Sequence, residues 1–275
     1  MNNEFEIARN QFIELCKKQN NKPFEKIAES CINDEGVIEA AVKLAYKDAQ
    51  RTMKGIKNYN KGDAFEAVSE KLEEYFNGDA CGNAEKFDEK HKELCDKWKK
   101  NFPNSNLGTY GKAQKIVNMA FKYLYCCKDA CEKEDYFKYC HIPLDSFTLE
   151  WFCRECRDKI VKSKIASWSA IAEYDLSDEK KNNDNDNDNE KKYYNYMFFQ
   201  EKFREMYSEN ELTPLQAEFI KWPEMQMKLS AEGFLIGLLE SPNNKEKEKI
   251  RSEKLSENYN RIIEFLGAYK SGNNK

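Results

Sequence analysis

Apolar residues recur every three or four positions along most of the chain, which is the spacing of amphipathic helices. This pattern predicts helices over residues 4–19, 23–31, 35–55, 63–78, 87–98, 111–125, 146–162, 193–207, 213–223 and 253–269. No stretch alternates like a β-hairpin, and no segment repeats at a fixed period. The pattern therefore predicts an all-α fold.

Local signals place several helix ends. Asp63 is a candidate N-cap, and either Asp145 or Ser146 can cap the helix that follows it. Thr213-Pro214 combines a capping residue with a proline at the first helical position. Pro223 is expected to end that short helix, because proline lacks the backbone N–H that a helix interior needs.

Composition agrees with a folded helical chain. Of the 275 residues, 40% are apolar and 13% aromatic, while glycine and proline number only 11 and 6. We expect one helical domain over residues 1–275, or two helical lobes over 1–105 and 106–275. Residues 180–192 read KKNNDNDNDNEKK, without one apolar side chain, so a flexible insertion is predicted at about 178–192.

A protein that binds nucleic acid by bulk charge would be basic, so with a formal net charge of −4 such a role would need a local basic groove. The first residues do not resemble a signal peptide, and no apolar run is long enough to span a membrane. These features predict a cytoplasmic protein whose ten cysteines are reduced thiols.

Candidate chemistry centres on helix 111–125 and the segment His141-Ile142-Pro143-Leu144-Asp145-Ser146. The helix carries lysines along the flank of its apolar face, and Asp145 follows Lys115 by thirty positions. If the two side chains meet, they form an amine nucleophile beside a carboxylate. The alternative is ordinary structure: solvated lysines with their stems on the surface, and an aspartate that only caps a helix.

The run from Gln114 to Tyr125, followed by Ile142-Pro143-Leu144-Asp145-Ser146, resembles the archaeal-type 8-oxoguanine DNA glycosylases of the helix-hairpin-helix superfamily. The segment from Glu218 to Trp222 is similar to bacterial relatives of that family. The resemblance covers about 35 residues well and about 120 weakly. It departs from the superfamily at Leu107-Gly108-Thr109-Tyr110-Gly111-Lys112, which is not the usual Gly-x-Gly turn.

The resemblance implies a helix-hairpin-helix glycosylase-like bundle that flips a base out of double-stranded DNA. It implies Lys115 as the nucleophile and Asp145 as its carboxylate, with excision of an oxidised purine and strand cleavage by β-elimination. Another modified base, such as one in invading DNA, is an alternative target. The candidate substrate-binding residues are Lys112, which also competes for the role of nucleophile, Gln114, Lys122, Trp222, Trp168 and Phe147.

No cofactor or metal is predicted. Cys153 and Cys156 have the gap of a zinc half-site, but they fall inside a predicted helix and have no second pair. Asp184–Asp188 lacks the glycine and glutamate of a calcium loop. Two other functions remain: a non-enzymatic interaction protein, which predicts an exposed and unpartnered Lys115, and a non-catalytic nucleic-acid binder. Oligomeric state is not predicted.

Overall fold

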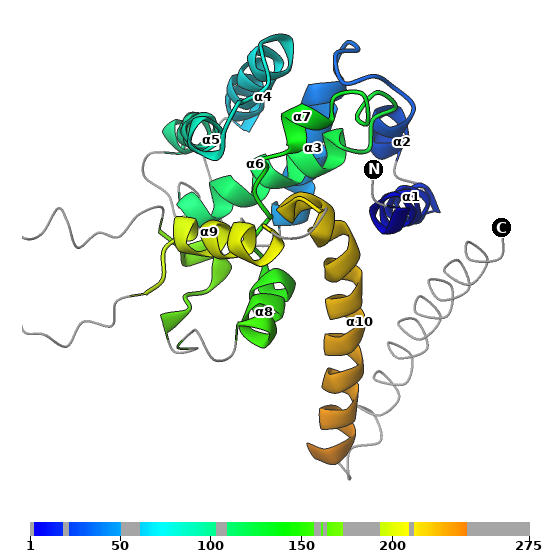
Figure 1. The fold of residues 1–275 in the computed structure, drawn as a ribbon, viewed down its shortest axis with the longest axis vertical. Helices are drawn as coiled ribbons and strands as arrows, with labels where there is room; N and C mark the ends of the chain where they lie inside the picture. The colour runs from blue at the N-terminus through cyan, green and yellow to red at the C-terminus, as the bar shows by residue number, and fades with distance from the viewer. Residues whose placement is uncertain are drawn as a thin grey trace, which may run out of the picture.

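The computed structural model describes residues 3–18, 22–50, 61–102, 109–156, 161, 164–172, 193–208 and 212–240, with side chains as far as residue 230. Every regular element within these ranges is helical, which confirms the predicted all-α fold (Figure 1). The insertion predicted at about 178–192 and the helix predicted at 253–269 lie outside the described residues.

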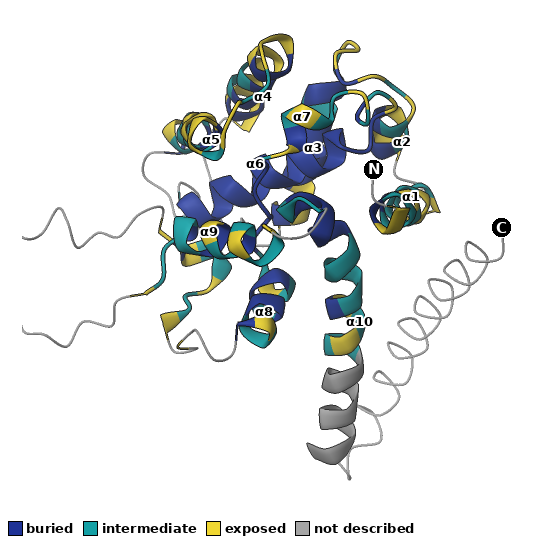
Figure 2. Cartoon of the chain, in the orientation of Figure 1, coloured by how far each residue is buried: buried dark blue, intermediate teal, exposed yellow. Residues whose placement is uncertain are grey.

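Helix α6 (Tyr110–Leu124) lies at the centre of the fold, and all of its residues are buried (Figure 2). The alternative in which these lysines are solvated, with their stems on the surface, is therefore wrong. Lys112 and Lys115 are each 7% exposed, and Lys122 is 2% exposed. Burying three cations in one helix is costly unless each has a partner, so the surroundings of these lysines are a candidate functional site.

The other helices surround α6 on several sides. Helices α3 and α5 and the 3-10 helix η3 pack directly against α6, while α10 packs against α1, α8 and α9. The elements are α1 (Asn3–Lys18), α2 (Lys22–Ala28), α3 (Val37–Ala49), α4 (Lys61–Asn77), α5 (Ala84–Lys100), α7 (Glu134–Phe137), α8 (Ser146–Glu155), η3 (Trp168–Ala170), α9 (Tyr196–Tyr207) and α10 (Pro214–Glu240).

Side-chain caps define where several helices begin. Asn83 starts α5 by accepting a hydrogen bond from the Lys86 N–H at 2.9 Å, and Asn195 starts α9 in the same way. Thr213 begins α10 as predicted, because its hydroxyl accepts the Gln216 N–H at 3.3 Å. Each cap satisfies an N–H group that the first helical turn leaves without a partner.

Three predicted boundaries are wrong. Asp63 is not an N-cap, because α4 already begins at Lys61 and Asp63 lies in its first turn. The helix predicted over 146–162 ends at Glu155, and Val161 is 50% exposed. Pro223 does not end α10, which runs through it to Glu240.

Gly111 is required for the packing of η3 on α6. A Cβ at this position would lie 2.1 Å from the carbonyl oxygen of Trp168, which no side chain could accept. The Thr109 hydroxyl also donates to the carbonyl of Ser169 at 2.8 Å. The glycine in the first turn of the central helix therefore serves close packing within the protein. None of the described helices is long and apolar enough to cross a membrane.

Candidate functional site

Lys115 and Asp145 meet in space. The Lys115 Nζ lies 2.8 Å from Oδ2 of Asp145, although thirty residues separate them. The lysine comes from the second turn of α6, and the aspartate is the N-cap of α8. Their side chains are only 9% and 13% exposed, so the pair is screened from most of the solvent. This is the amine–carboxylate arrangement expected from the sequence.

The two carboxylate oxygens of Asp145 have separate partners. Oδ1 accepts the backbone N–H groups of Phe147 and Thr148, each at 2.9 Å, and so caps α8. Oδ2 accepts the Lys115 amine and the Trp222 indole N–H, the latter at 3.1 Å. Capping therefore explains one oxygen and leaves the other to the lysine and the tryptophan.

The charge of Lys115 keeps Asp145 ionised. Burial alone would raise the pKa of the Asp145 carboxyl. The positive charge of Lys115 and the hydrogen bonds that Asp145 accepts outweigh burial, so the pKa lies below its ordinary value. The carboxylate is thus ionised at neutral pH in the resting protein, and it lies in a poorly solvated place where its field is strong.

A second lysine on α6 forms a deeper pair. The Lys122 Nζ lies 2.6 Å from Oε2 of Glu218 on α10, and the two side chains are 3% and 1% exposed. Three aromatic rings surround this ammonium, with centroids at 4.5 Å for Phe12, 4.9 Å for Phe219 and 5.3 Å for Trp222. Burial raises the pKa of Glu218, although Lys122 acts in the opposite direction.

Trp222 joins the two pairs. Its indole N–H donates to Asp145, and its ring lies beside the Lys122 ammonium. The ring also makes an edge contact with Phe147, at a centroid distance of 5.5 Å. Two of the three aromatic residues predicted to contact a base are therefore gathered around the Lys115–Asp145 pair.

Asp48 on α3 belongs to the same surroundings. It accepts a hydrogen bond from the hydroxyl of Tyr123 on α6. The pKa of its carboxyl is raised by burial, against the lowering effect of Tyr123, Lys115 and Lys122. Three carboxylates and two ammonium groups therefore share one region: Asp48, Asp145, Glu218, Lys115 and Lys122.

The remaining predicted site residues have different places. Gln114 is fully buried and uses both amide atoms inside the protein, so its expected contact with a substrate is not available in this structure. Lys112 lies one turn before Lys115 and its pKa is lowered by burial. Trp168 is half-buried in η3, at the start of α6.

A second polar network connects to α6 through Asn118. His141 accepts or donates hydrogen bonds at both ring nitrogens, with the Tyr196 hydroxyl at 2.8 Å and with Asp88 at 2.7 Å. Asp88 also binds Arg204, and Tyr196 contacts Asn118 of α6 at 2.8 Å. Burial lowers the pKa of His141 to about 4, so the ring is neutral at physiological pH.

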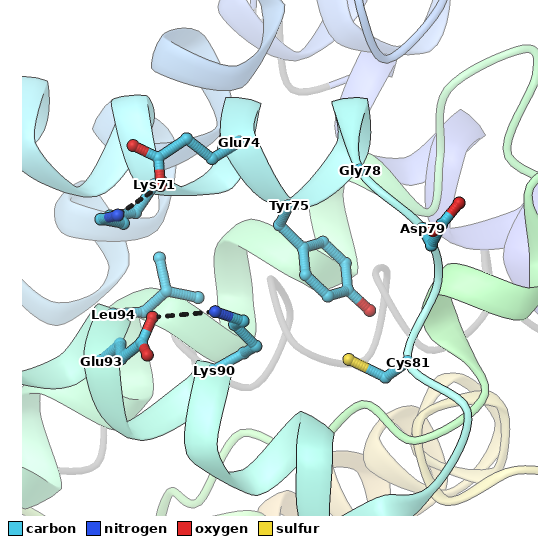
Figure 3. Close-up of a pocket in the computed structure, with 9 residues that line it drawn as sticks. All are labelled: Lys71, Glu74, Tyr75, Gly78, Asp79, Cys81, Lys90, Glu93 and Leu94. Atoms are coloured by element: carbon cyan, nitrogen blue, oxygen red, sulfur yellow. Dashed lines mark hydrogen bonds and ion pairs between the residues drawn. The ribbon is translucent and has the colours of Figure 1, made fainter.

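A surface pocket of about 290 Å³ lies between α4 and α5 (Figure 3). Lys71 pairs with Glu74 and Lys90 with Glu93 in its walls, so these four charges compensate one another. Tyr75 and Cys81 lie side by side in it. None of its lining residues belongs to the Lys115–Asp145 cluster, and we assign it no function.

Within the described part of the chain, no group of three or more histidine, cysteine or acidic side chains is placed to hold a metal ion. Cys153 lies in the last turns of α8, and Cys156 follows as its C-cap with Sγ 3.6 Å from the sulfur of Met206. Comparison with models of protein families, with curated proteins and with solved structures gives no match.

Sequence reasoning missed Glu218, Asp48 and Phe12, which complete the surroundings of the lysines. Glu218 lies in the segment whose similarity to bacterial relatives was noted, but a lone glutamate before Phe219 carries no sign of burial. Asp48 follows the apolar face of α3 like any surface residue. Only the tertiary structure places these residues beside α6.

Proposed function

We propose that this protein is a DNA glycosylase that excises a damaged or modified base, with Lys115 as the nucleophile and Asp145 as its carboxylate partner. The observation that carries the proposal is the 2.8 Å contact between their side chains, which come from different helices and are both largely buried. The resemblance of these segments to archaeal-type 8-oxoguanine DNA glycosylases supports the same two roles. Double-stranded DNA is then the partner.

The chemistry needs a neutral amine at the start. Lys115 transfers one proton to Oδ2 of Asp145, and its lone pair forms a bond to C1′ of a flipped nucleotide. The bond between C1′ and the base nitrogen breaks, and its electron pair leaves with the base, which takes the proton from Asp145. As Asp145 gives up this proton its negative charge returns and stabilises the positive charge that develops on the sugar.

The covalent intermediate accounts for lyase activity. The C1′–O4′ bond then breaks, O4′ receives a proton from the Lys115 nitrogen, and the bond between Lys115 and C1′ becomes a protonated Schiff base. Loss of a proton from C2′ then expels the 3′ phosphate, and water releases the lysine from the remaining sugar. Trp222 and Phe147 supply aromatic surface beside the pair on which a flipped base can stack.

The test distinguishes Lys115 from Lys112, the two candidate nucleophiles on α6. Borohydride reduces a Schiff base to a stable bond, so the full chain is incubated with duplexes carrying a panel of oxidised and other modified bases. We expect a trapped adduct that is lost in Lys115→Ala. An adduct that persists in Lys115→Ala and disappears in Lys112→Ala would transfer the nucleophile's role to Lys112.

Lys90→Ala is the matched control, since Lys90 pairs with Glu93 on α5 outside the cluster. It should form the adduct at the wild-type rate. No adduct with any base in the panel would refute the proposed activity. The non-enzymatic interaction protein was expected to have an exposed and unpartnered Lys115, whereas Lys115 is 7% exposed and paired.

A further inference from the structure

The segment that carries Asp145 has almost no regular structure of its own. Residues 140–144 lie in neither a helix nor a strand, yet Ile142 and Leu144 are fully buried. Buried backbone N–H and C=O groups need partners, and Pro143 between them has no N–H. The position of Asp145 therefore depends on whatever satisfies this backbone.

Two buried glutamines satisfy it in the same way. Gln114 on α6 donates to the carbonyl of Leu144 at 3.0 Å and accepts its N–H at 3.1 Å. Gln200 on α9 donates to the carbonyl of Ile142 at 2.9 Å and accepts its N–H at 2.9 Å. Each side-chain amide thus forms with one backbone residue the two hydrogen bonds that a neighbouring β-strand would form. Gln114 and Gln200 are only 0% and 1% exposed.

The Gln114 amide is fully occupied. Its nitrogen also donates to the carbonyl of Gly111 at 2.9 Å, and its oxygen also accepts from Asn118 at 3.0 Å. An amide has two donors and two acceptor positions, and all four are used here. A flipped amide would therefore lose these hydrogen bonds. Gln114 therefore has one orientation relative to α6.

We propose that Gln114 is a positioning residue that fixes the distance between Lys115 and Asp145. Gln114 immediately precedes Lys115 on α6, and it binds both polar backbone groups of Leu144, which immediately precedes Asp145. One side chain thus ties together the two neighbours of the reacting pair. Gln200 binds two residues earlier in the segment and comes from a helix that carries neither member of the pair.

This comparison supplies a matched control. Gln114→Met and Gln200→Met each remove one buried amide and its two bonds to the segment, while keeping a similar side-chain volume. Both variants should lose stability. Only Gln114→Met should loosen the contact between Lys115 and Asp145.

The first readout is independent of activity. The pKa of the Asp145 carboxyl is measured by NMR on the full chain with ¹³C-labelled aspartate. Its charged neighbours are Lys115 on α6, Glu218 on α10 and Asp48 on α3. In Gln114→Met the pKa should rise by about 1 or more, which is the size of a lost close charge partner. In Gln200→Met it should stay at the wild-type value.

The outcomes separate the positioning role from a structural one. An unchanged pKa in Gln114→Met, or an equal rise in both variants, would overturn the proposal. If Gln114→Met does not fold, Gln114→Asn replaces it under the same criteria, because its shorter side chain cannot reach both groups of Leu144.

The second readout rests on the proposed function. With a base that gives an adduct in the wild type, Gln114→Met should trap about 100-fold more slowly, since a misplacement of about 1 Å can cost that much in rate. The dissociation constant for the same DNA should stay unchanged. Absence of an adduct in the wild type would refute the glycosylase, while the NMR titration would still decide the role of Gln114.

Discussion

Removing Lys122 tests whether its buried pair with Glu218 is charged and how strongly it supports the fold. Lys122→Met keeps an unbranched side chain but leaves the Glu218 carboxylate, which is 1% exposed, without its cation. Breaking one partner out of a buried ion pair costs about 3–5 kcal/mol. That is a large part of the stability of about 5–15 kcal/mol that is typical of a domain.

The loss should depend on pH, with a definite sign. The pKa of Glu218 is already raised above its ordinary value of 4.5 by burial, and loss of Lys122 removes the main effect that opposes burial. The folded variant therefore binds a proton more tightly than the unfolded chain. Its stability is highest below the unfolded pKa and falls as the pH rises through the folded pKa, by up to about 1.4 kcal/mol per pH unit.

Urea denaturation followed by circular dichroism at pH 5 and pH 8 measures both effects. Lys43 provides a matched control, because it also pairs with a glutamate at 2.6 Å, but its side chain is 49% exposed. Lys43→Met should cost less than about 1 kcal/mol at either pH. Adding Glu218→Gln to Lys122→Met should make the loss of stability relative to the wild type equal at the two pH values. A Lys122→Met loss below about 1 kcal/mol that is equal at both pH values would refute this account of the pair.

Three other substitutions test separate parts of the structure. Arg9→Met should cost about 1.5–3 kcal/mol in urea denaturation, because Arg9 donates to the carbonyls of Tyr125 and Cys127 beyond the end of α6 at 2.7 and 2.8 Å; a neutral result would contradict this. Because the pKa of His141 is lowered to about 4, the free energy of unfolding of the wild type should fall by up to about 3 kcal/mol as the pH falls from about 6.5 to 4. His141→Gln should flatten that pH profile. Asp145→Ser keeps a cap on α8 and should be about 1 kcal/mol more stable than Asp145→Ala, yet neither variant should form a trapped adduct.

Much of the fold could be predicted from the sequence, because local sequence patterns indicate most of the helices. The apolar spacing of α1, α3 and α5 and the capping residue Thr213 are local signals, and they depend little on the rest of the chain. Pro223 shows the limit of such signals. Buried residues on both sides of it, Phe219 and Met225, hold α10 in place, so tertiary packing outweighs the local cost of proline.

The candidate site was only partly predictable for a related reason. Lys115 and Asp145 could be connected through a family resemblance that spans both segments. The burial of α6 on every side could not be predicted, because its lysines, Gln114 and Asn118 look like a polar face. They are buried because partners distant in sequence satisfy them: Asp145 binds Lys115, Tyr196 of α9 binds Asn118, and Glu218 of α10 binds Lys122. No local pattern records such pairings.

The two lysine pairs form one unit, because both depend on Trp222. This side chain donates to the Asp145 oxygen that receives Lys115, and its ring lies 5.3 Å from the Lys122 ammonium. Stability alone does not require such a group, since apolar residues of similar volume often replace a buried ion pair without loss. The proposed glycosylase activity would require it, because that activity needs a lysine beside a carboxylate, away from water and next to an aromatic surface. For the same reason, substitutions at Lys122 and Asp145 should not be additive, because each changes the surroundings of the tryptophan that the other also contacts.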